Sequence, residues 1–313
     1  MATLITGAAG QIGINLTKEL LKRGKKVIAV DNFITGSKKN FSLVPKEQLQ
    51  FIECKTELLK IDQPLTEIYH LACPTGVPNL KTIPEEMISA CVLGITNILN
   101  IAKEQKVPFL FTSSSEVYGS PEVMPQPESY TGNVDPLGER APYEEGKRIA
   151  ETITATYVRK YGVQAKIVRV FNSFGPHFSE KDERVIPIIL KQALHDLPIT
   201  IHGDGSQQRT FISVFDLIPG LFTVMEKGIV GEAYNLGSKI KYTILELAKT
   251  IIKTTNSKSI IQYTERPPHD HNKRQPDLTK IHSLGWKQKL SLEDGIKLAV
   301  EYISQQEQQD PSA

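Results

Sequence analysis

Short apolar runs rich in β-branched residues alternate along the first half of the chain with longer stretches whose apolar residues recur at helical spacing. The apolar runs are ATLIT (2–6), KVIAV (26–30), LQFIE (49–53), EIYHLA (67–72), VPFLFT (107–112) and QAKIVRVF (164–171). The helical stretches are QIGINLTKELLKRG (11–24) and the segments 85–105 and 143–162. This alternation predicts an α/β fold in which helices cover both faces of a parallel sheet.

The regular alternation weakens after FGPH (174–177). One further strand and three helical patterns come after it, at 232–237 and at 184–195, 243–252 and 292–303. We therefore predict a first domain of residues 1–175, which the strand near 232–237 rejoins, and a smaller second domain of residues 176–304. The polar residues 305–313, QQEQQDPSA, predict a flexible tail.

Composition and charge exclude several classes of protein. The 313 residues carry a net charge of +2, which gives no basis for nucleic-acid or membrane binding, and we find no apolar run of membrane-spanning length. The N-terminus lacks the basic segment of a signal peptide. Cys54, Cys73 and Cys91 have no paired spacing, so each is interpreted as a small buried residue of a cytoplasmic protein. His269 and His271 lack a third spaced ligand, so we predict a solvated loop and no metal.

TGAAGQIG (6–13) directly follows the first predicted strand and opens the first predicted helix. Small residues at such a turn let the backbone approach a pyrophosphate, and the helix N-terminus adds unpaired N–H groups. This context favours a dinucleotide site on a Rossmann-type doubly wound sheet over an ordinary strand-to-helix turn. The residues expected to bind the cofactor at this turn are Gly7, Gly10, Gln11, Ile12 and Gly13.

Asp31 ends the second predicted strand, 18 residues after Gly13. A carboxylate in this position can hold both ribose hydroxyls and repels a 2′-phosphate, so NAD is favoured over NADP. Asn32, the next residue, is placed in the same site. Lys38 and Lys39 would argue for NADP, but a lysine pair in a loop is ordinarily a solvated face.

Tyr143 and Lys147 form the motif YxxxK within APYEEGK, and TSSSEVYG (112–119) follows the apolar run VPFLF. On a helix the two side chains lie one turn apart on one face. The lysine ammonium and an oxidised nicotinamide would both lower the pKa of the tyrosine toward neutral pH. Alone, the pair would be a solvent-facing contact. Together with the glycine turn and TSSSEVYG it indicates catalysis.

These motifs resemble the extended short-chain dehydrogenase/reductase family that acts on nucleotide sugars, and the resemblance runs from the glycine turn to LGW (284–286). It implies an NAD-dependent enzyme with a UDP-sugar substrate and a smaller C-terminal substrate-binding domain. Tyr143 and Lys147 are then the catalytic pair. Ser114, three places before VYG, is the hydrogen-bond partner of the sugar's 4-hydroxyl and then of its 4-keto oxygen.

Within this family, HLACP (70–74), DNFITG (31–36) and RVFNSFGP (169–176) are similar to the UDP-glucuronate decarboxylases, which form UDP-xylose. The 4,6-dehydratases carry Asp-Glu before VYG, whereas this chain has Ser115 and then Glu116. The resemblance thus implies decarboxylation through a 4-keto intermediate, with recycling of NAD. A UDP-sugar 4-epimerase, a 4,6-dehydratase and a non-catalytic NAD-binding sensor stay open as alternatives.

Glu116 is the fourth candidate catalytic residue. On a strand that continues past Ser114 it would face the same side as Ser114 and lie near the C5–C6 end of the sugar. The alternative is a structural role in capping a turn. The resemblance also implies that the substrate is bound by an amide and three guanidinium groups, which suit phosphate and carboxylate oxygens. These residues are Asn172, Arg184, Arg209 and Arg274.

Extended members of this family pair two long helices across a two-fold axis, which implies a homodimer. The matching helices of this chain are the predicted segments 85–105 and 143–162. The apolar residues expected at the seam are Ile95, Ile98, Ile101, Ile149, Ile153 and Tyr157.

Overall fold

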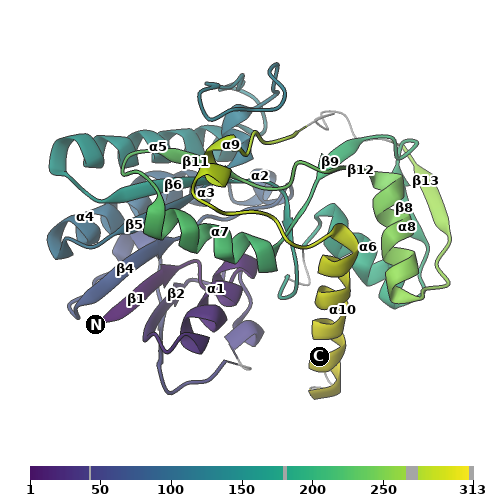
Figure 1. Ribbon diagram of the computed structural model, residues 1–313, viewed down its shortest axis with the longest axis horizontal. Helices are drawn as coiled ribbons and strands as arrows, with labels where there is room; N and C mark the ends of the chain where they lie inside the picture. Colours follow the sequence, from purple (N-terminus) through teal and green to yellow (C-terminus); the bar gives the residue numbers. More distant parts are fainter. Residues whose placement is uncertain (42–43, 179–181, 266–273, 310–313) are drawn as a thin grey trace.

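The centre of the molecule is a seven-stranded sheet in which every pair of neighbouring strands is parallel (Figure 1). The computed structural model describes residues 1–41, 44–178, 182–265 and 274–309. The strand order, β11-β6-β5-β4-β1-β2-β3, confirms the predicted doubly wound fold. The strands are β1 (Ala2–Thr6), β2 (Val27–Asp31), β3 (Leu49–Glu53), β4 (Leu65–His70), β5 (Phe109–Ser114), β6 (Ala165–Val170) and β11 (Ala233–Leu236).

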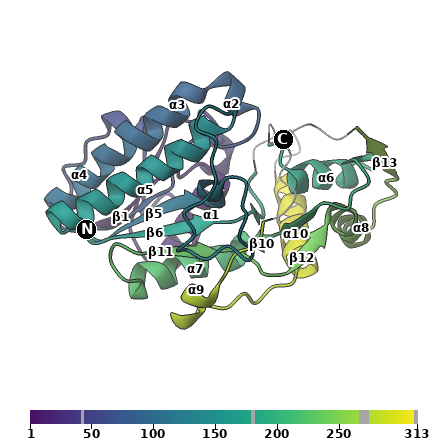
Figure 2. The same ribbon diagram turned by 90° about the horizontal axis from the view of Figure 1, so that it is seen from above.

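Helices cover both faces of this sheet (Figure 2). One face carries α3, α4 and α5, and the other carries α1 and α7. Strands β1 and β2 are therefore buried at every residue, which is why they appear in the sequence as continuous apolar runs. The helices and short helical turns of this layer are α1 (Gln11–Lys22), η1 (Lys38–Phe41), η2 (Thr56–Leu58), α2 (Asn79–Thr82), α3 (Pro84–Ser89), α4 (Ile95–Gln105), η4 (Ser115–Tyr118), α5 (Ala141–Tyr161), α7 (Val214–Lys227) and α9 (Thr279–Ser283).

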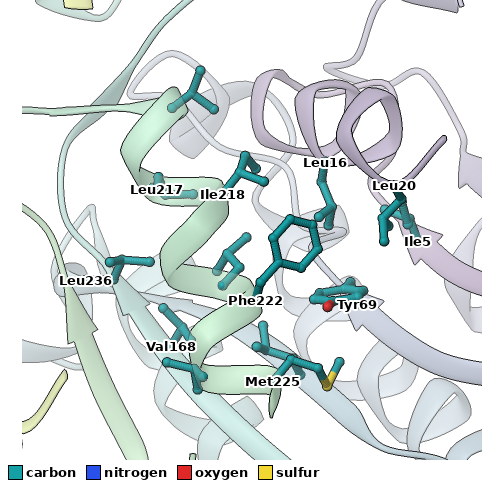
Figure 3. Packing of buried hydrophobic residues seen from close by; sticks show 14 of the residues in the cluster. Ile5, Leu16, Leu20, Tyr69, Val168, Leu217, Ile218, Phe222, Met225 and Leu236 are labelled. Atoms are coloured by element: carbon teal, nitrogen blue, oxygen red, sulfur yellow. The ribbon is translucent and has the colours of Figure 1, made fainter. Parts of the chain in front are cut away.

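Helix α7 packs its apolar side chains onto the sheet beside α1 (Figure 3). The ring of Phe222 meets the ring of Tyr69 edge-on, with 6.1 Å between the centroids. Leu16 and Leu20 of α1 belong to the same buried cluster. The sequence analysis did not identify α7, because the helix is apolar almost throughout and contains Pro219, which together obscure a helical period.

The segment predicted as one helix, 85–105, is divided by a turn of π-helix, η3 (Ala90–Gly94). Among the described residues, Pro84–Gln105 is the one helical stretch long and apolar enough to span a membrane, and half of its apolar window is buried. Ile95 and Ile98 lie in the core between this stretch and the sheet. The stretch is therefore a core helix of the sheet domain.

A smaller unit follows the sheet and lies beside it (Figure 1). Its core includes Leu190, Ile251 and Ile296, contributed by three helices. These helices are α6 (Val185–Leu194), α8 (Ile244–Thr255) and α10 (Leu292–Gln309). Three strand pairs complete the unit: β7 (Ser173–Phe174) with β10 (Ile212–Ser213), β8 (Ile199–His202) with β13 (Ile261–Thr264), and β9 (Gln208–Thr210) with β12 (Lys241–Thr243). Helix α10 continues to Gln309, into the segment predicted as a flexible tail.

The chain leaves the sheet after β6 and returns to it with β11, which pairs with β6. This is the strand expected near 232–237. Residues between these two strands build parts of the smaller unit and also α7, which covers the sheet. The two units are therefore interleaved along the sequence, and the boundary at 175/176 stays a prediction.

Candidate active site

A cavity of about 1370 Å³ opens at the carboxyl edge of the sheet. Its lining comes from the segments that follow the strands β1 to β6, from the start of α5, from α3 and from the segment before α6. Ligands of doubly wound sheets bind at this edge. A site for one drug-sized molecule measures roughly 300–1,000 Å³, so this cavity has room for a dinucleotide and a second ligand.

The glycine turn leaves no space for side chains. Gly7 has a φ of +70°, and a Cβ on it would lie 2.8 Å from the backbone nitrogen of Ala72. A Cβ on Gly13 would lie 2.1 Å from the carbonyl oxygen of Gly7. Gly10 precedes α1 with an extended backbone and offers no capping side chain. The first N–H groups of α1 are therefore left for the phosphates of a ligand.

Gln11 and Arg184 connect this turn to the smaller unit. The Nε2 of Gln11 donates to the carbonyl oxygen of Gly175 at 2.8 Å, and the Nη2 of Arg184 donates to the Oε1 of Gln11 at 3.2 Å. Arg184 also pairs with Asp182 at 2.6 Å. Gln11, Arg184 and Ile12 all line the cavity. The first two thus link the predicted cofactor and substrate regions.

Asp31 ends β2 beside the glycine turn. Its carboxylate accepts hydrogen bonds from the backbone N–H of Ala9 at 2.9 Å and of Phe33 at 2.8 Å. Burial raises the pKa of Asp31, and these backbone hydrogen bonds offset part of that effect. Asn32 accepts from the N–H of Ile34 at 3.2 Å, and both predicted residues line the cavity.

The structure brings Ser114, Tyr143 and Lys147 together at the end of β5. The hydroxyl of Ser114 is close enough to Tyr143 to lower the pKa of the tyrosine. The Nζ of Lys147 donates to the carbonyl oxygen of Thr112 at 3.0 Å and lies 5.8 Å from the centroid of the Tyr143 ring. Lys147 is buried, whereas Tyr143 is half-buried, and all three side chains belong to residues that line the cavity.

Burial and Lys147 act on the pKa of Tyr143 in opposite directions, and the lowering by Lys147 is the one expected from the sequence. Burial raises the pKa of Tyr143, and it outweighs the lowering by Lys147 and by the hydrogen bond with Ser114. Burial also lowers the pKa of Lys147, but Cys73 and Tyr143 outweigh it and raise that pKa to about 12. Lys147 is therefore cationic at neutral pH. A second positive charge near the phenol is needed to bring its pKa toward neutral.

Glu116 does not lie on a continuing strand, so the expectation that it shares a face with Ser114 is wrong. Strand β5 ends at Ser114, and η4 begins at the next residue. The physical reason is a cap: the Oγ of Ser114 accepts from the N–H of Glu116 at 3.2 Å. The chain therefore turns at Ser114, and the Glu116 side chain is placed by η4.

The Glu116 carboxylate is held between two guanidinium groups. It pairs with Arg140 at 2.6 Å, and Arg274 donates to both of its oxygens. Burial alone would raise the pKa of Glu116, but Arg274 and Arg140 outweigh it and hold that pKa well below its usual range. Glu116 is therefore ionised at neutral pH and has no proton to donate.

Arg140 is a site residue that the sequence analysis missed. It lines the cavity and contacts both Glu116 and, at 3.1 Å, Glu144. The sequence does contain an indication of this contact, because Arg140 and Glu144 are four residues apart at the start of the helix that carries Tyr143.

The remaining predicted substrate residues divide into two groups. Asn172 lines the cavity and donates to the carbonyl oxygen of Thr210 at 3.3 Å. Among the described residues, Arg209 and Arg274 are not part of the lining. Arg274 is connected to the site by its ion pair with Glu116, which does line the cavity. Arg209 lies on β9.

The prediction for His269 and His271 falls on residues outside those that the structure describes. Within the described ranges, no three His, Cys, Asp or Glu residues are grouped so that they could hold a metal ion.

The model of the NAD dependent epimerase/dehydratase family matches residues 3–237, which contain every element of the sheet. The chain belongs to this family. The resemblance to extended short-chain dehydrogenases/reductases is thus confirmed. The cofactor of the family is NAD, and the glycine turn, the α1 N-terminus and Asp31 fit a dinucleotide.

Other members of the epimerase/dehydratase family are similar over almost the whole chain. UDP-glucuronic acid decarboxylase 2 of Arabidopsis thaliana is 42% identical over 97% of this chain and 68% of its own length. UDP-glucuronic acid decarboxylase 1 of Danio rerio is 39% identical over 97% of this chain and 72% of its own length. Among solved structures, UDP-glucose 4-epimerase of Thermotoga maritima has a TM-score of 0.88 and 28% identity, covering 98% of this chain and 99% of that one.

A second solved member, UDP-glucuronic acid 4-epimerase of Bacillus cereus in complex with UDP-glucuronic acid and NAD, has a TM-score of 0.85 and 28% identity. The match covers 98% of this chain and 100% of the other. The two solved structures thus have the same fold as this chain, but their sequence identity to it is lower than that of the decarboxylases.

Proposed function

We propose that this protein is an NAD-dependent decarboxylase that converts UDP-glucuronate to UDP-xylose and CO₂. The observation that carries the proposal is its identity of about 40% to several UDP-glucuronic acid decarboxylases over nearly the full chain, against 28% to the epimerases of known structure. The site chemistry described above supports it, because Ser114, Tyr143 and Lys147 share one cavity with an ionised carboxylate and a guanidinium.

The first step in this proposal is removal of the 4-hydroxyl proton. Tyr143 takes this proton as the general base, and the permanent charge of Lys147 stabilises the phenolate form that it needs. Ser114 donates a hydrogen bond to the sugar oxygen as that oxygen becomes a ketone. Bound NAD would supply the hydride acceptor at C4, from which the hydride is later returned, and its positively charged nicotinamide would lower the pKa of the phenol further.

Decarboxylation then depends on the position of the ketone. A ketone at C4 is β to the C6 carboxylate, so the C5–C6 bond can break and release CO₂, with its electron pair passing into an enolate at C4–C5. A proton from water then adds at C5, which gives the 4-keto pentose whose C4 is reduced again. Ser114 and the protonated Tyr143 hold the developing oxyanion. Glu116 has no proton to give, so we assign it a positioning role, in which it fixes the guanidinium of Arg140 at the cavity wall.

The second candidate function is 4-epimerisation of a UDP-sugar. It is favoured by the Bacillus cereus structure, whose protein is a 4-epimerase with UDP-glucuronic acid bound on the same fold. The two reactions share the oxidation at C4 and differ in the fate of the 4-keto sugar. A 4,6-dehydratase is a third alternative, since a dTDP-glucose 4,6-dehydratase of Streptomyces venezuelae has a TM-score of 0.87 and 25% identity.

One experiment separates these functions. The protein is incubated with NAD and, in separate reactions, UDP-glucuronate, UDP-glucose and dTDP-glucose, and the products are separated by chromatography and weighed by mass spectrometry. Our proposal expects UDP-glucuronate to lose the mass of CO₂. An isomer of unchanged mass would establish the epimerase, and loss of water from a hexose substrate would establish the dehydratase.

We also propose that the protein forms a homodimer through the face that carries α4 and α5. The predicted seam needs correction, because Ile95, Ile98 and Ile101 are buried within the chain itself. The exposed apolar residues on the same helical layer are Ile88 at 47%, Leu93 at 60% and Ile149 at 40% exposure. Light scattering should give twice the chain mass, and Leu93→Glu should shift it to the monomer. A monomeric wild type at micromolar concentration would refute the proposal.

A further inference from the structure

Two cysteines that are 18 residues apart in the sequence meet beside the candidate active site. Cys73 follows β4 and is half-buried in the lining of the cavity, whereas Cys91 is buried in η3. Their sulfur atoms are 3.4 Å apart. A disulfide has an S–S length of about 2.05 Å, so the sulfurs would have to approach by roughly 1.3–1.4 Å.

The cysteine pair lies directly against the helix that carries Tyr143 and Lys147. A Cβ on Gly146 would lie 3.3 Å from the Sγ of Cys91, so the thiol touches α5 at the residue before Lys147. On the other side, the segment that contains Cys73 packs on the glycine turn, since Ala72 lies against Gly7. Movement of Cys91 would therefore act on the catalytic helix, and movement of the Cys73 segment would act on the dinucleotide turn.

Cys91 lies at an irregular turn of its helical stretch. The π-helical turn η3 interrupts the regular hydrogen bonding between α3 and α4, and such turns are found frequently at functional sites. Cys73 is in an irregular segment outside any strand or helix. Cys73 therefore lies outside regular structure, and Cys91 lies at the irregular turn of its helical stretch.

The two thiols have unequal chemistry. The hydrogen bond with Cys91 and the charge of Lys147 lower the pKa of the Cys73 thiol against the effect of burial. The same hydrogen bond and burial raise the pKa of the Cys91 thiol. Cys73, which lines the cavity, is thus the nucleophile, and Cys91, which is buried behind it, is the resolving thiol.

We propose that Cys73 and Cys91 form an oxidation site at which hydrogen peroxide closes a reversible disulfide and so stops turnover. The Cys73 thiolate attacks one peroxide oxygen and breaks the O–O bond, which gives a sulfenic acid and one water after protonation. The Cys91 sulfur then attacks the sulfenic sulfur, and the hydroxyl leaves as a second water. Two thiols lose two electrons in total, and one peroxide is reduced to two waters.

Disulfide formation would affect turnover in two ways, by moving the Cys73 segment and by removing a negative charge. Closing the disulfide pulls the Cys73 segment toward η3 and removes the thiolate next to Lys147. Displacements of about 1 Å at a catalytic site cost about 10²-fold in rate. We therefore expect a loss of at least about tenfold on oxidation and full recovery on reduction with dithiothreitol.

The chemical part of the proposal is tested without any substrate. The protein is treated with a small excess of hydrogen peroxide, and the free thiols are then alkylated with iodoacetamide. The masses of the tryptic peptides are measured by mass spectrometry. Trypsin cuts at Lys81, between the two cysteines, so the disulfide alone joins their peptides. We expect the joined peptides in the wild type and in the control Cys54→Ser, and their absence in Cys91→Ser. Alkylation of both thiols after peroxide treatment would overturn the proposal.

The second readout is activity, which rests on the proposed function and is measured on the same samples. Each variant is compared with its own untreated rate, so a change in basal activity does not enter. The wild type and Cys54→Ser should lose activity on oxidation and regain it with dithiothreitol, whereas Cys91→Ser should lack the reversible loss. If the disulfide forms and turnover is unchanged, the proposal that the disulfide stops turnover is refuted. Absence of activity before oxidation would count against the proposed function alone, since the disulfide is scored by mass.

Discussion

Replacing Glu116 with glutamine removes the negative charge that holds two arginines together. The carboxylate accepts from Arg140 at 2.6 Å and from the Nη2 of Arg274 at 3.0 Å, with a further bond from the Nη1 of Arg274. Glutamine keeps one accepting oxygen but places an NH₂ group opposite a guanidinium. At least one charge-assisted hydrogen bond is therefore lost, and two cations are left close together.

The cost can be estimated from the burial of these groups. The side chains of Glu116 and Arg274 are 17% and 5% exposed, so water replaces little of the lost interaction. A hydrogen bond to a charged group contributes about 1.5–3 kcal/mol, and breaking a buried ion pair costs about 3–5 kcal/mol. We expect Glu116→Gln to lower the free energy of unfolding by about 2–5 kcal/mol, or the Tm by roughly 3–8 °C.

Two assays test this variant. Differential scanning fluorimetry measures the Tm, and rapid mixing with UDP-glucuronate measures the absorbance of enzyme-bound reduced cofactor. Because Glu116 holds Arg140 at the cavity wall and Tyr143 acts in the first step, oxidation should proceed, and misplacement of Arg140 by about 1 Å should slow CO₂ loss by about 10²-fold. The reduced cofactor should therefore accumulate.

Glu145→Gln is the matched control. Glu145 lies on α5 and pairs with Arg148 at 3.5 Å, but its side chain is 41% exposed. Its loss should change stability by less than about 0.5 kcal/mol and leave the rate unchanged. If Glu116→Gln keeps the wild-type Tm and turnover, the reasoning is refuted. A lower Tm with normal turnover would show that Glu116 has a purely structural role. Loss of cofactor reduction would show that Glu116 acts in the first step, the oxidation at C4.

Three further predictions concern the redox step and the cofactor. Tyr143→Phe should form neither reduced cofactor nor CO₂, because both require loss of the 4-hydroxyl proton; release of CO₂ by this variant would contradict the assignment. Lys147→Ala removes a charge that lowers the pKa of Tyr143, so the base-dependent limb of the pH profile of kcat should move to higher pH; an unmoved limb would contradict that electrostatic role. NAD should bind at least tenfold more tightly than NADP, since one repulsion of about 1.4 kcal/mol between Asp31 and the 2′-phosphate suffices, and calorimetric titration with equal affinities would exclude this.

Most of the sheet could be predicted because its inner strands, such as β1 and β2, are buried on both faces. A buried parallel strand must be apolar at nearly every position, and β1 shows this in the sequence alone. The same property hid α7, since a helix that packs on several neighbours is apolar all round and loses its period. The π-helical turn at Ala90–Gly94 has no sequence signal of comparable strength, because its residues continue an apolar helical pattern.

The parts of the candidate site that could be predicted are those whose residues are close together in the sequence. Tyr143 and Lys147 are one helical turn apart, so their proximity can be derived from the sequence itself. The position of Glu116 could not be derived in this way, because it depends on the Ser114 cap and on Arg274, which is 158 residues away in the sequence. The pairing of Cys73 with Cys91 likewise depends on how η3 packs beside the end of β4, and cysteine spacing alone gave no indication of it.

The late position of β11 in the sequence has a consequence for synthesis on the ribosome. Strand β6 is complete at residue 170, but its outer neighbour begins only at Ala233, after α7 has been made. A nascent chain of 175 residues therefore presents an open sheet edge at β6 and an uncovered apolar face at Tyr69, both of which favour aggregation. For the same reason the sheet domain cannot be transferred to another protein as one continuous stretch, because any such exchange must cut the chain on both sides of the inserted segment.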